Sequence, residues 1–243
     1  MELINPLIDE FFREGNLLSD LIDNYTYRPN QVELADVIYK AFLDQEFLIA
    51  EAGTGVGKTY AYLIPTVLWA LNEGEKVVIS TKTKALQQQL VEKDIPNILR
   101  LLGTPLKVVE AKGRENYLCW NKYMKILAGR RAMTPEEAKF VEQILTWAEQ
   151  TKIGDKKELG LKAELIKHWW IVAADRKSCA KENCRYHDKC FRLKMIRSLD
   201  KAEIIIVNHA LLLSDIVVDN SILPEYKYLI IDEAHYIDRE AFS

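Results

Sequence analysis

The chain has 243 residues, of which 49% are hydrophobic and 28% are charged, and its formal net charge is −3. This composition supplies a full hydrophobic core, and the length fits one or two domains. No apolar run reaches the roughly 18–20 residues that cross a bilayer, and the acidic start lacks the basic region of a secretion signal. We therefore expect a cytoplasmic protein with no membrane partner, and the slight excess of acids argues against a uniformly basic DNA coat.

Two short helical patterns at 2–13 and 17–23 precede a longer helix that is expected to begin at Pro29. Proline suits a first helical turn, and apolar residues recur at helical spacing after it. Gln31 lies in the first turn of this helix, a short distance ahead of a glycine-rich loop. Its amide can both donate to and accept from the edge of adenine. A solvent-facing glutamine is the alternative.

The glycine-rich loop is the strongest motif in the chain. Residues 47–50 predict a strand, and residues 60–71 predict a helix. Between them, residues 52–59 fit the P-loop pattern, with Ala52 in place of the first glycine. Such a loop and the following helix N-terminus present N–H groups to phosphates. We therefore predict a nucleoside triphosphate ligand, ATP if Gln31 reads adenine, with Mg²⁺. The residues assigned to it are Gly53, Thr54, Gly55, Gly57, Lys58 for the β- and γ-phosphates, and Thr59 for Mg²⁺.

A buried-strand pattern at 76–81 is followed by polar residues at its carboxyl end. Open parallel sheets bind ligands at that end of their strands. Hydroxyls, amides and a helix N-terminus are also what a phosphate backbone needs. An ordinary polar helix start explains the same pattern. The candidate nucleic-acid contacts are Thr81, Thr83, Lys84 and Gln89.

A third strand is expected at 106–111, and helices are expected between 120 and 175, one of them beginning at Pro135 behind a Thr134 cap. Four cysteines flank or follow this region: Cys119, Cys179, Cys184 and Cys190. Four thiolates can hold Zn²⁺ or an iron–sulfur cube. Zinc ribbons usually use paired Cys-x-x-Cys motifs, which are absent here, although His187 leaves a zinc site open.

Positive charge is concentrated between residues 176 and 201, where nine Lys/Arg and three Asp/Glu give +6, so the rest of the chain carries −9. Such a block is typical of a nucleic-acid-binding surface. A solvated helix face is the alternative.

The last motifs are two apolar strand patterns that end in polar residues. Residues 203–207 lead to Asn208 and His209, again at a carboxyl end. Residues 228–231 lead to Asp232, Glu233 and His235, which is a Walker B pattern. Asp232 is predicted to hold Mg²⁺, Glu233 to orient and activate the attacking water, and His235 to couple nucleotide state to the rest of the protein.

Together these motifs resemble the iron–sulfur superfamily 2 DNA helicases, of the bacterial damage-inducible-G and xeroderma-pigmentosum-group-D type. The similarity is carried, in the family's order, by residues 28–31, 51–59, 80–90, 112–119, 207–213 and 232–235. The resemblance implies an α/β fold, with a RecA-like P-loop domain at 1–111 and 201–243 and a mostly parallel sheet. A mainly helical domain at 112–200 interrupts it and carries a [4Fe–4S] cluster on the four cysteines.

The resemblance also implies ATP-driven 5′→3′ translocation on single-stranded DNA. It places Arg28 at the nucleotide, and Lys112, Arg114, Asn208 and His209 toward DNA. The family continues with an arch domain and a second motor domain, whereas this sequence stops at Ser243. We therefore expect these residues to bind ATP and single-stranded DNA without unwinding a duplex. A non-catalytic single-stranded-DNA-binding module and a zinc-bearing P-loop ATPase are the alternatives.

Overall fold

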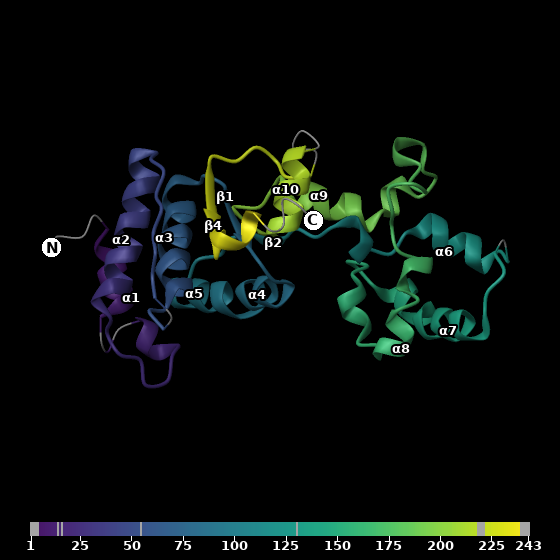
Figure 1. Ribbon diagram of the computed structural model, residues 1–243, viewed down its shortest axis with the longest axis horizontal. Helices are drawn as coiled ribbons and strands as arrows, with labels where there is room; N and C mark the ends of the chain where they lie inside the picture. The colour runs from purple at the N-terminus through teal and green to yellow at the C-terminus, as the bar shows by residue number, and fades with distance from the viewer. Residues whose placement is uncertain are drawn as a thin grey trace. The chain divides into compact units, whose positions relative to one another are not determined.

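The computed structural model describes residues 5–13, 15, 17–53, 55–129, 131–217 and 222–238. The chain divides into two compact units (Figure 1). Residues 1–110 and 201–243 form the first unit, and residues 111–200 form the second. None of the helices in the described ranges has the length and hydropathy of a membrane span.

The first unit is built on a four-stranded parallel sheet. Its described strands are β1 (Val77–Thr81), β2 (Val108–Glu110), β3 (Ile204–Asn208) and β4 (Tyr228–Ile231), in the order β2-β3-β1-β4. β1 pairs with β3 and with β4, whereas β2 pairs with β3. The two central strands are apolar and buried, as expected where a parallel sheet is covered on both faces. The predicted α/β fold with a parallel sheet is confirmed.

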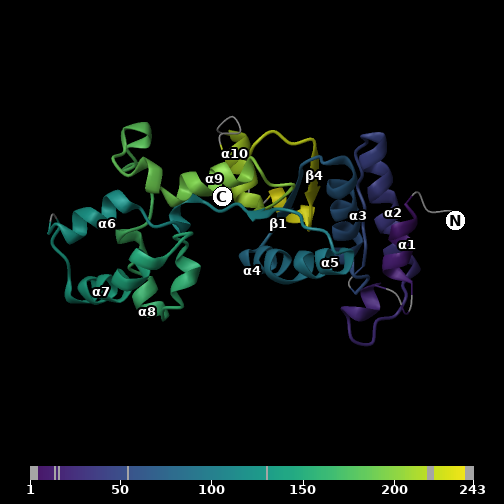
Figure 2. The same ribbon diagram turned by 180° about the vertical axis from the view of Figure 1, so that it is seen from behind.

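Helices pack around this sheet, and α3 is the most deeply buried of them (Figure 2). Residues 61–70 of α3 are buried without interruption, and α2 packs along it. Aromatic rings of α2, α3 and β4 meet with centroids 5.1–5.7 Å apart, which ties these three elements into one core. The described helices of the unit are α1 (Pro6–Phe12), α2 (Pro29–Asp44), α3 (Lys58–Glu73), α4 (Lys84–Gln89), α5 (Ile95–Leu102) and α10 (His209–Val217). Leu90–Asp94 forms a π-helical segment, and Leu17–Asp20 and Ala234–Tyr236 form 3₁₀ turns.

The segment before the P-loop differs from the prediction. Residues 47–50 have the composition of a buried strand, but no strand forms there, and Phe47 and Ile49 are fully exposed. A β-strand needs a neighbour that supplies backbone hydrogen bonds. β1 has neighbours on both sides, so only the edge strands β2 and β4 of the described sheet have an unpaired side, and residues 47–50 form no ladder with either.

The second unit is mainly helical. Its described helices are α6 (Trp120–Leu127), α7 (Pro135–Gln150), α8 (Ala163–Ile166) and α9 (Phe191–Leu199), joined by 3₁₀ turns at Arg114–Asn116, Lys156–Leu159, Trp169–Ile171, Lys181–Asn183 and His187–Lys189. Thr134 and Glu137 form a reciprocal capping box at the start of α7. Trp169 is buried, and its indole N–H donates to the Glu115 carbonyl. Trp170 is exposed, so only one of these neighbouring tryptophans is a core residue.

Candidate nucleotide site

Gly57 joins the P-loop to α3, and a side chain at this position would clash with its surroundings. Gly57 precedes the first residue of α3 and has φ +85°, in the left-handed region. A Cβ on Gly57 would lie 2.2 Å from the amide nitrogen of Gln31. Gly55 is also left-handed, at φ +83°, but has open space around it, as does Gly53. The loop therefore approaches α2 closely at Gly57 and is open at Gly53 and Gly55. Thr54 lies outside the described residues.

Two residues at the start of α2 hold this loop. Gln31 Nε2 donates to the Gly57 carbonyl at 2.8 Å, and Arg28 Nη1 donates to the Gly55 carbonyl at 2.8 Å. Gln31 is only 2% exposed, so the solvent-facing alternative is wrong. Its Oε1 is buried without a hydrogen-bond partner among the described groups. A buried acceptor of this kind is costly unless a donor reaches it, and an adenine amino group is such a donor.

A pocket of about 350 Å³ opens beside the loop. Besides predicted residues, it contains a turn and two side chains that the sequence analysis missed. The turn has Asn24 at φ +55°, and Asp-Asn is a common turn sequence, which is the signal that was available. Burial and the nearby Asp94 charge raise the pKa of Tyr60 to about 12. The lining residues are Ile22, Asp23, Asn24, Tyr25, Arg28, Gln31, Gly57, Thr59, Tyr60, Gln89 and Asp94.

The Walker B residues meet the P-loop at the carboxyl end of β4. The Asp232 backbone N–H donates to the Ser80 carbonyl at 2.9 Å, which extends the pairing with β1 by one residue. Lys58 Nζ then lies 3.2 Å from Glu233 Oε1. Tyr62, one turn into α3, lies with its hydroxyl 3.4 Å from Asp232 Oδ2. Two motifs at opposite ends of the sequence therefore form one polar cluster.

This cluster holds two carboxylates but only one lysine, so negative charge is in excess. Burial and the neighbouring Glu233 raise the pKa of Asp232, and Lys58 opposes this rise. Burial and the Asp232 charge also raise the pKa of Tyr62, whose hydroxyl lies near that of Thr59. A hard cation that prefers oxygen ligands would relieve the repulsion between the two carboxylates. The hydroxyl of Thr59 and the carboxylate of Asp232 thus fit Mg²⁺ in type and charge.

His235 links this cluster to the turn behind it. Its Nδ1 lies 3.6 Å from Glu233 Oε2, and its ring centroid is 4.1 Å from that of Tyr236. Lys82, which follows β1, lies 3.1 Å from the centroid of the Tyr236 ring. These contacts connect Glu233, through His235 and Tyr236, with Lys82 after β1.

The predicted DNA contacts of the first unit fall into two groups. Thr83 and Lys84 are exposed at the start of α4, where the Thr83 hydroxyl accepts from the Leu86 N–H. Thr81 and His209 have no exposed surface, and His209 Nδ1 lies 2.7 Å from the Ser80 hydroxyl. Only Thr83 and Lys84 are therefore exposed enough to contact a DNA strand directly.

The other two candidates of that unit are already engaged. Gln89 lines the nucleotide pocket and donates to Asp94 Oδ2 at 2.8 Å. Asn208 accepts from the Leu211 N–H at 2.9 Å, in the first turn of α10. These contacts give each side chain a structural role within its own element or pocket.

In the second unit, Lys112 forms an ion pair with Asp155 at 2.5 Å, and the two side chains are 9% and 5% exposed. Arg114 is half-buried and close enough to Arg192 that their like charges lower the pKa of Arg192, after the larger effect of burial. Arg114 thus adds to a positively charged region, whereas Lys112 is used inside the unit.

All four cysteines lie in the second unit as free thiols. Cys119 precedes α6 and Cys190 precedes α9. Burial raises the pKa of the Cys119 thiol, and charges on Cys184 and Cys190 raise it further, so three of the four thiols share one neighbourhood. Within the described ranges, no three His, Cys, Asp or Glu side chains converge to metal-binding distance. The donors fit a cluster in type and number, but their sulfurs are not gathered.

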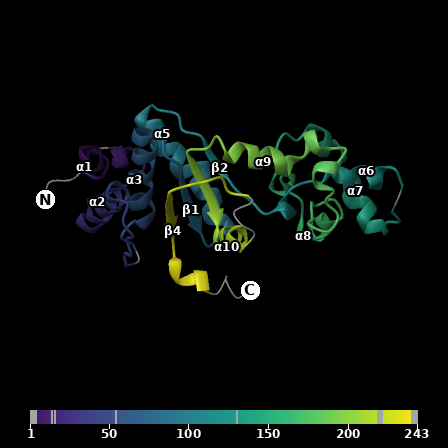
Figure 3. The ribbon, with the colours of Figure 1, turned by 90° about the horizontal axis from the view of Figure 1, so that it is seen from above.

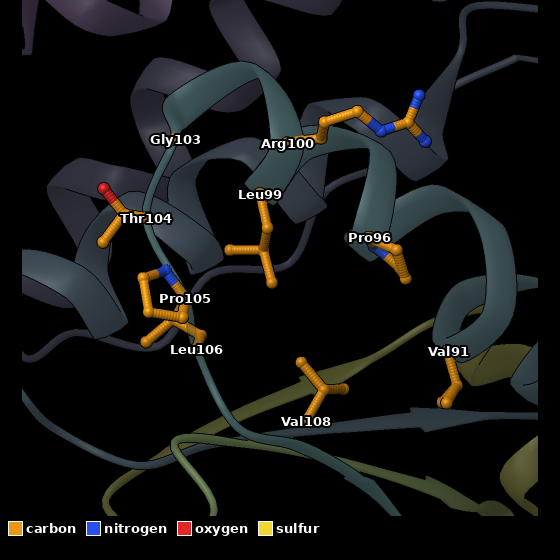
Figure 4. Close-up of a pocket in the computed structure, with 9 residues that line it drawn as sticks. All are labelled: Val91, Pro96, Leu99, Arg100, Gly103, Thr104, Pro105, Leu106 and Val108. Carbon is orange, nitrogen blue, oxygen red and sulfur yellow. The ribbon is translucent and has the colours of Figure 1, made fainter.

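A second pocket, of about 650 Å³, lies at the β2 edge of the sheet and away from the P-loop (Figure 4). Its lining is apolar except for Thr104 and Arg100, and Figure 4 shows the Arg100 guanidinium directed away from the apolar side chains. Its lining offers no glycine-rich loop and no carboxylate for Mg²⁺, so the smaller pocket is the candidate nucleotide site. The lining residues are Val91, Pro96, Leu99, Arg100, Gly103, Thr104, Pro105, Leu106 and Val108.

Comparison with known proteins agrees with this geometry. A family model described as DEAD/DEAH box helicase matches residues 28–138, which include Gln31 and the P-loop. The chain is thus similar to DEAD/DEAH box helicases over this range. It is 34% identical to "ATP-dependent helicase DinG" of Mycobacterium tuberculosis (strain H37Ra) over 228 residues, which are 86% of the chain and 34% of that protein.

Two other relatives extend the comparison. The chain is 34% identical to "ATP-dependent DNA helicase YoaA" of Escherichia coli over 95% of the chain and 36% of that protein. It is 32% identical to "3'-5' exonuclease DinG" of Bacillus subtilis over 96% of the chain and 25% of that protein. The chain thus spans about a third or less of the length of these relatives.

Proposed function

We propose that these residues are the ATP-binding part of an ATP-dependent DNA helicase motor. The observation that carries the proposal is the 3.2 Å contact between Lys58 and Glu233, with Asp232 beside them and open space at Gly53 and Gly55. A lysine, two carboxylates and a helix N-terminus in one place are the groups that phosphoryl transfer uses. The names of the relatives support helicase activity for the proteins that carry them.

Each residue has a task in this proposal. Lys58 leaves Glu233 and neutralises the β- and γ-phosphates, while N–H groups at the start of α3 cradle them. Thr59 and Asp232 hold Mg²⁺, which supplies charge neutralisation when bound. Glu233, released from Lys58, accepts a proton from the attacking water. Gln31 Oε1 accepts from the adenine amino group, which favours ATP over GTP.

The four cysteines are proposed to hold a [4Fe–4S] cluster. Four free thiols, with Cys119 within electrostatic reach of Cys184 and Cys190, support this assignment. The sulfurs must move together when the cluster binds, because they do not converge in the described geometry. Zinc is the rival ligand. Metal analysis of anaerobically purified protein separates them: about four irons per chain with a brown colour, or about one zinc without colour.

Single-stranded DNA is the proposed partner, and full unwinding is proposed to need a second motor domain. Arginine fingers from such a domain contribute roughly 10³–10⁵ in rate to related enzymes. We therefore expect residues 1–243 to bind ATP and DNA, to hydrolyse ATP slowly and not to unwind a duplex. Robust unwinding by these residues alone would contradict that expectation.

Calorimetric titration of residues 1–243 with ATP and Mg²⁺ tests the nucleotide proposal. Lys58→Ala is expected to abolish binding, whereas Lys40→Ala, at an exposed lysine of α2, leaves it unchanged. Equal binding by both variants would refute the P-loop assignment. The alternative, a non-catalytic DNA-binding module, predicts salt-sensitive binding to single-stranded DNA with no titratable ATP site.

A further inference from the structure

Trp170 places a large aromatic ring on the surface of the second unit. It belongs to the 3₁₀ turn Trp169–Ile171, and it is 57% exposed. The turn itself is anchored, because the neighbouring Trp169 is buried and its indole N–H donates to the Glu115 carbonyl at 2.8 Å. Tryptophan is enriched at binding surfaces, where its ring supplies a large and rigid contact area. An exposed ring on a fixed turn therefore has the properties of a contact site.

A cation lies over one face of the Trp170 ring. The guanidinium carbon of Arg131 is 4.7 Å from the ring centroid. Arg131 is held there by Glu137, whose Oε1 accepts from the Arg131 Nη2 at 2.8 Å while its Oε2 accepts from the Thr134 N–H. Figure 3 shows the loop that carries Arg131 between the end of α6 and the start of α7. Because Trp170 keeps more than half of its surface exposed, a planar group can reach the ring on the side away from Arg131.

A second cation fixes the backbone of Trp170. Lys122, in the first turn of α6, donates from its Nζ to the Trp170 carbonyl at 3.3 Å. The same ammonium group forms an ion pair with Asp175 at 2.6 Å. Lys122 and Arg131 thus hold the tryptophan through its main chain and through its ring, and each is itself held by a carboxylate. The orientation of the ring is therefore set before any ligand arrives, which lowers the entropy that binding costs.

The chain that supplies these two cations is basic. Residues 120–135 contain four Lys/Arg and no Asp/Glu, so this stretch carries +4. It is separate in sequence from the basic block at 176–201, and its Lys125 is exposed on α6. Positive charge attracts a phosphate backbone, and aromatic rings set among such charges stack on the bases of single strands. A protein partner could also cover an exposed tryptophan, but the charge of this stretch favours an anionic polymer.

We propose that Trp170, with Arg131 on its other face, is a stacking site for one base of single-stranded DNA. The base lies on the open side of the ring, and the exposed Lys125 is available to a neighbouring phosphate. Such a site accepts any base, because every base has a π-face. The inference rests on the proposal that single-stranded DNA is the partner of this chain. It does not depend on nucleotide binding at the P-loop.

Fluorescence anisotropy of anaerobically purified residues 1–243 tests the site with two labelled oligonucleotides. One is an oligothymidylate of about 20 nucleotides, and the other is an abasic strand with the same number of phosphates. Trp170→Ala is expected to weaken binding of the thymidylate about tenfold and to leave binding of the abasic strand unchanged, because only the thymidylate can stack. Trp170→Tyr keeps an aromatic ring and should retain most of the affinity. The salt dependence should not change in either variant, because stacking releases no counterions.

Ile153→Ala is the matched control, because Ile153 is another apolar residue of the second unit and is 50% exposed. It should change neither affinity, and an unchanged thermal midpoint checks the fold of each variant.

The outcomes that overturn the inference differ in what they leave standing. Unchanged thymidylate binding in Trp170→Ala, or an equal loss for both strands, would remove the stacking site and keep DNA as the partner. Binding of neither strand by the unchanged chain would remove the DNA partner as well. Self-association in light scattering that Trp170→Ala abolishes, with DNA binding unchanged, would assign the ring to a protein contact.

Discussion

Lys58 Nζ lies 3.2 Å from Glu233 Oε1, although 175 residues separate the two in sequence. Both side chains are about one-third exposed, so the pair is screened by water and contributes little to folding stability. The contact is instead relevant to ligand binding. In the proposed complex, the nucleotide's phosphates and Glu233 compete for the same ammonium group, so binding exchanges one anionic partner of Lys58 for another.

Removing the charge of Glu233 is therefore expected to separate binding from hydrolysis. In Glu233→Gln, Lys58 loses its competing carboxylate and the phosphates meet one negative charge fewer. We expect ATP to bind at least as tightly as to the unchanged chain, while hydrolysis falls by roughly 10²–10⁴, the usual contribution of a general base. Calorimetry gives the affinity, and release of radiolabelled phosphate gives the rate.

The control for that variant is Glu75→Gln, which removes one partner of a Lys–Glu contact on the surface, the pair with Lys227 at 2.6 Å. It is expected to change neither the affinity nor the rate. Weaker ATP binding in Glu233→Gln would mean that Glu233 holds the nucleotide or its metal rather than the attacking water.

The P-loop glycines predict a graded series of stabilities. Gly57→Ala combines a left-handed backbone with a Cβ 2.2 Å from Gln31 Nε2, whereas Gly55→Ala has the backbone strain alone. The strain is about 1–2 kcal/mol for a residue other than glycine, so Gly55→Ala should lower the free energy of unfolding by that amount. Gly57→Ala should lower it further and displace Gln31. Gly53→Ala, with neither problem, is the control. Urea unfolding midpoints measure the series, and equal midpoints for all three would contradict the described loop.

The charge of Asp232 predicts a pH-dependent stability. Its pKa is raised in the folded protein by burial and by Glu233, so the folded state holds this proton more tightly than the unfolded state. The contribution to stability is fully present below the ordinary pKa of 3.8 and is lost as pH rises through the folded pKa. At neutral pH Asp232→Asn should therefore raise the thermal midpoint of the nucleotide-free chain, and the gain should disappear near pH 3. Magnesium-dependent ATP binding should be lost.

Asp215→Asn supplies the contrasting case. The Asp215 carboxylate accepts from the backbone N–H groups of Ile222 and Leu223 at 2.7 and 3.1 Å, and it is fully buried. An asparagine keeps one acceptor oxygen only, so this change should lower the thermal midpoint at neutral pH. Stabilisation by both substitutions would show a general charge effect and remove the special role of Asp232.

Much of the fold was predictable from sequence because the strongest signals are local. Apolar runs located the four strands, and Thr134 with Glu137 located the start of α7. The P-loop and Walker B patterns could be paired before the structure brought Lys58 and Glu233 together, since each carries its chemistry in a few consecutive residues.

What escaped prediction depends on partners distant in sequence. Residues 47–50 look like a strand, but strand formation is decided by a neighbour and not by composition. Tyr62 has no motif of its own, and only the fold sets its hydroxyl beside Asp232. Thr81 and His209 share the polar signal of Thr83 but are buried. Thr81 is the last residue of β1 and His209 the first residue of α10, whereas Thr83 caps the exposed start of α4.

Lys112 and Arg114 give the sharpest test of a predicted DNA contact against a structural role. Lys112 forms a buried pair with Asp155, so Lys112→Ala leaves a buried carboxylate unpaired and should cost about 3–5 kcal/mol of stability in the second unit. Arg114 is half-buried near Arg192, and like charges at that spacing gain from an anion. Arg114→Ala should therefore leave stability unchanged and weaken binding to single-stranded DNA, with a smaller dependence on salt. Urea unfolding and fluorescence anisotropy measure the two effects, with Lys139→Ala, at an exposed lysine of α7, as the control for both. A Lys112→Ala protein that is fully stable but defective in DNA binding would place Lys112 on the DNA after all.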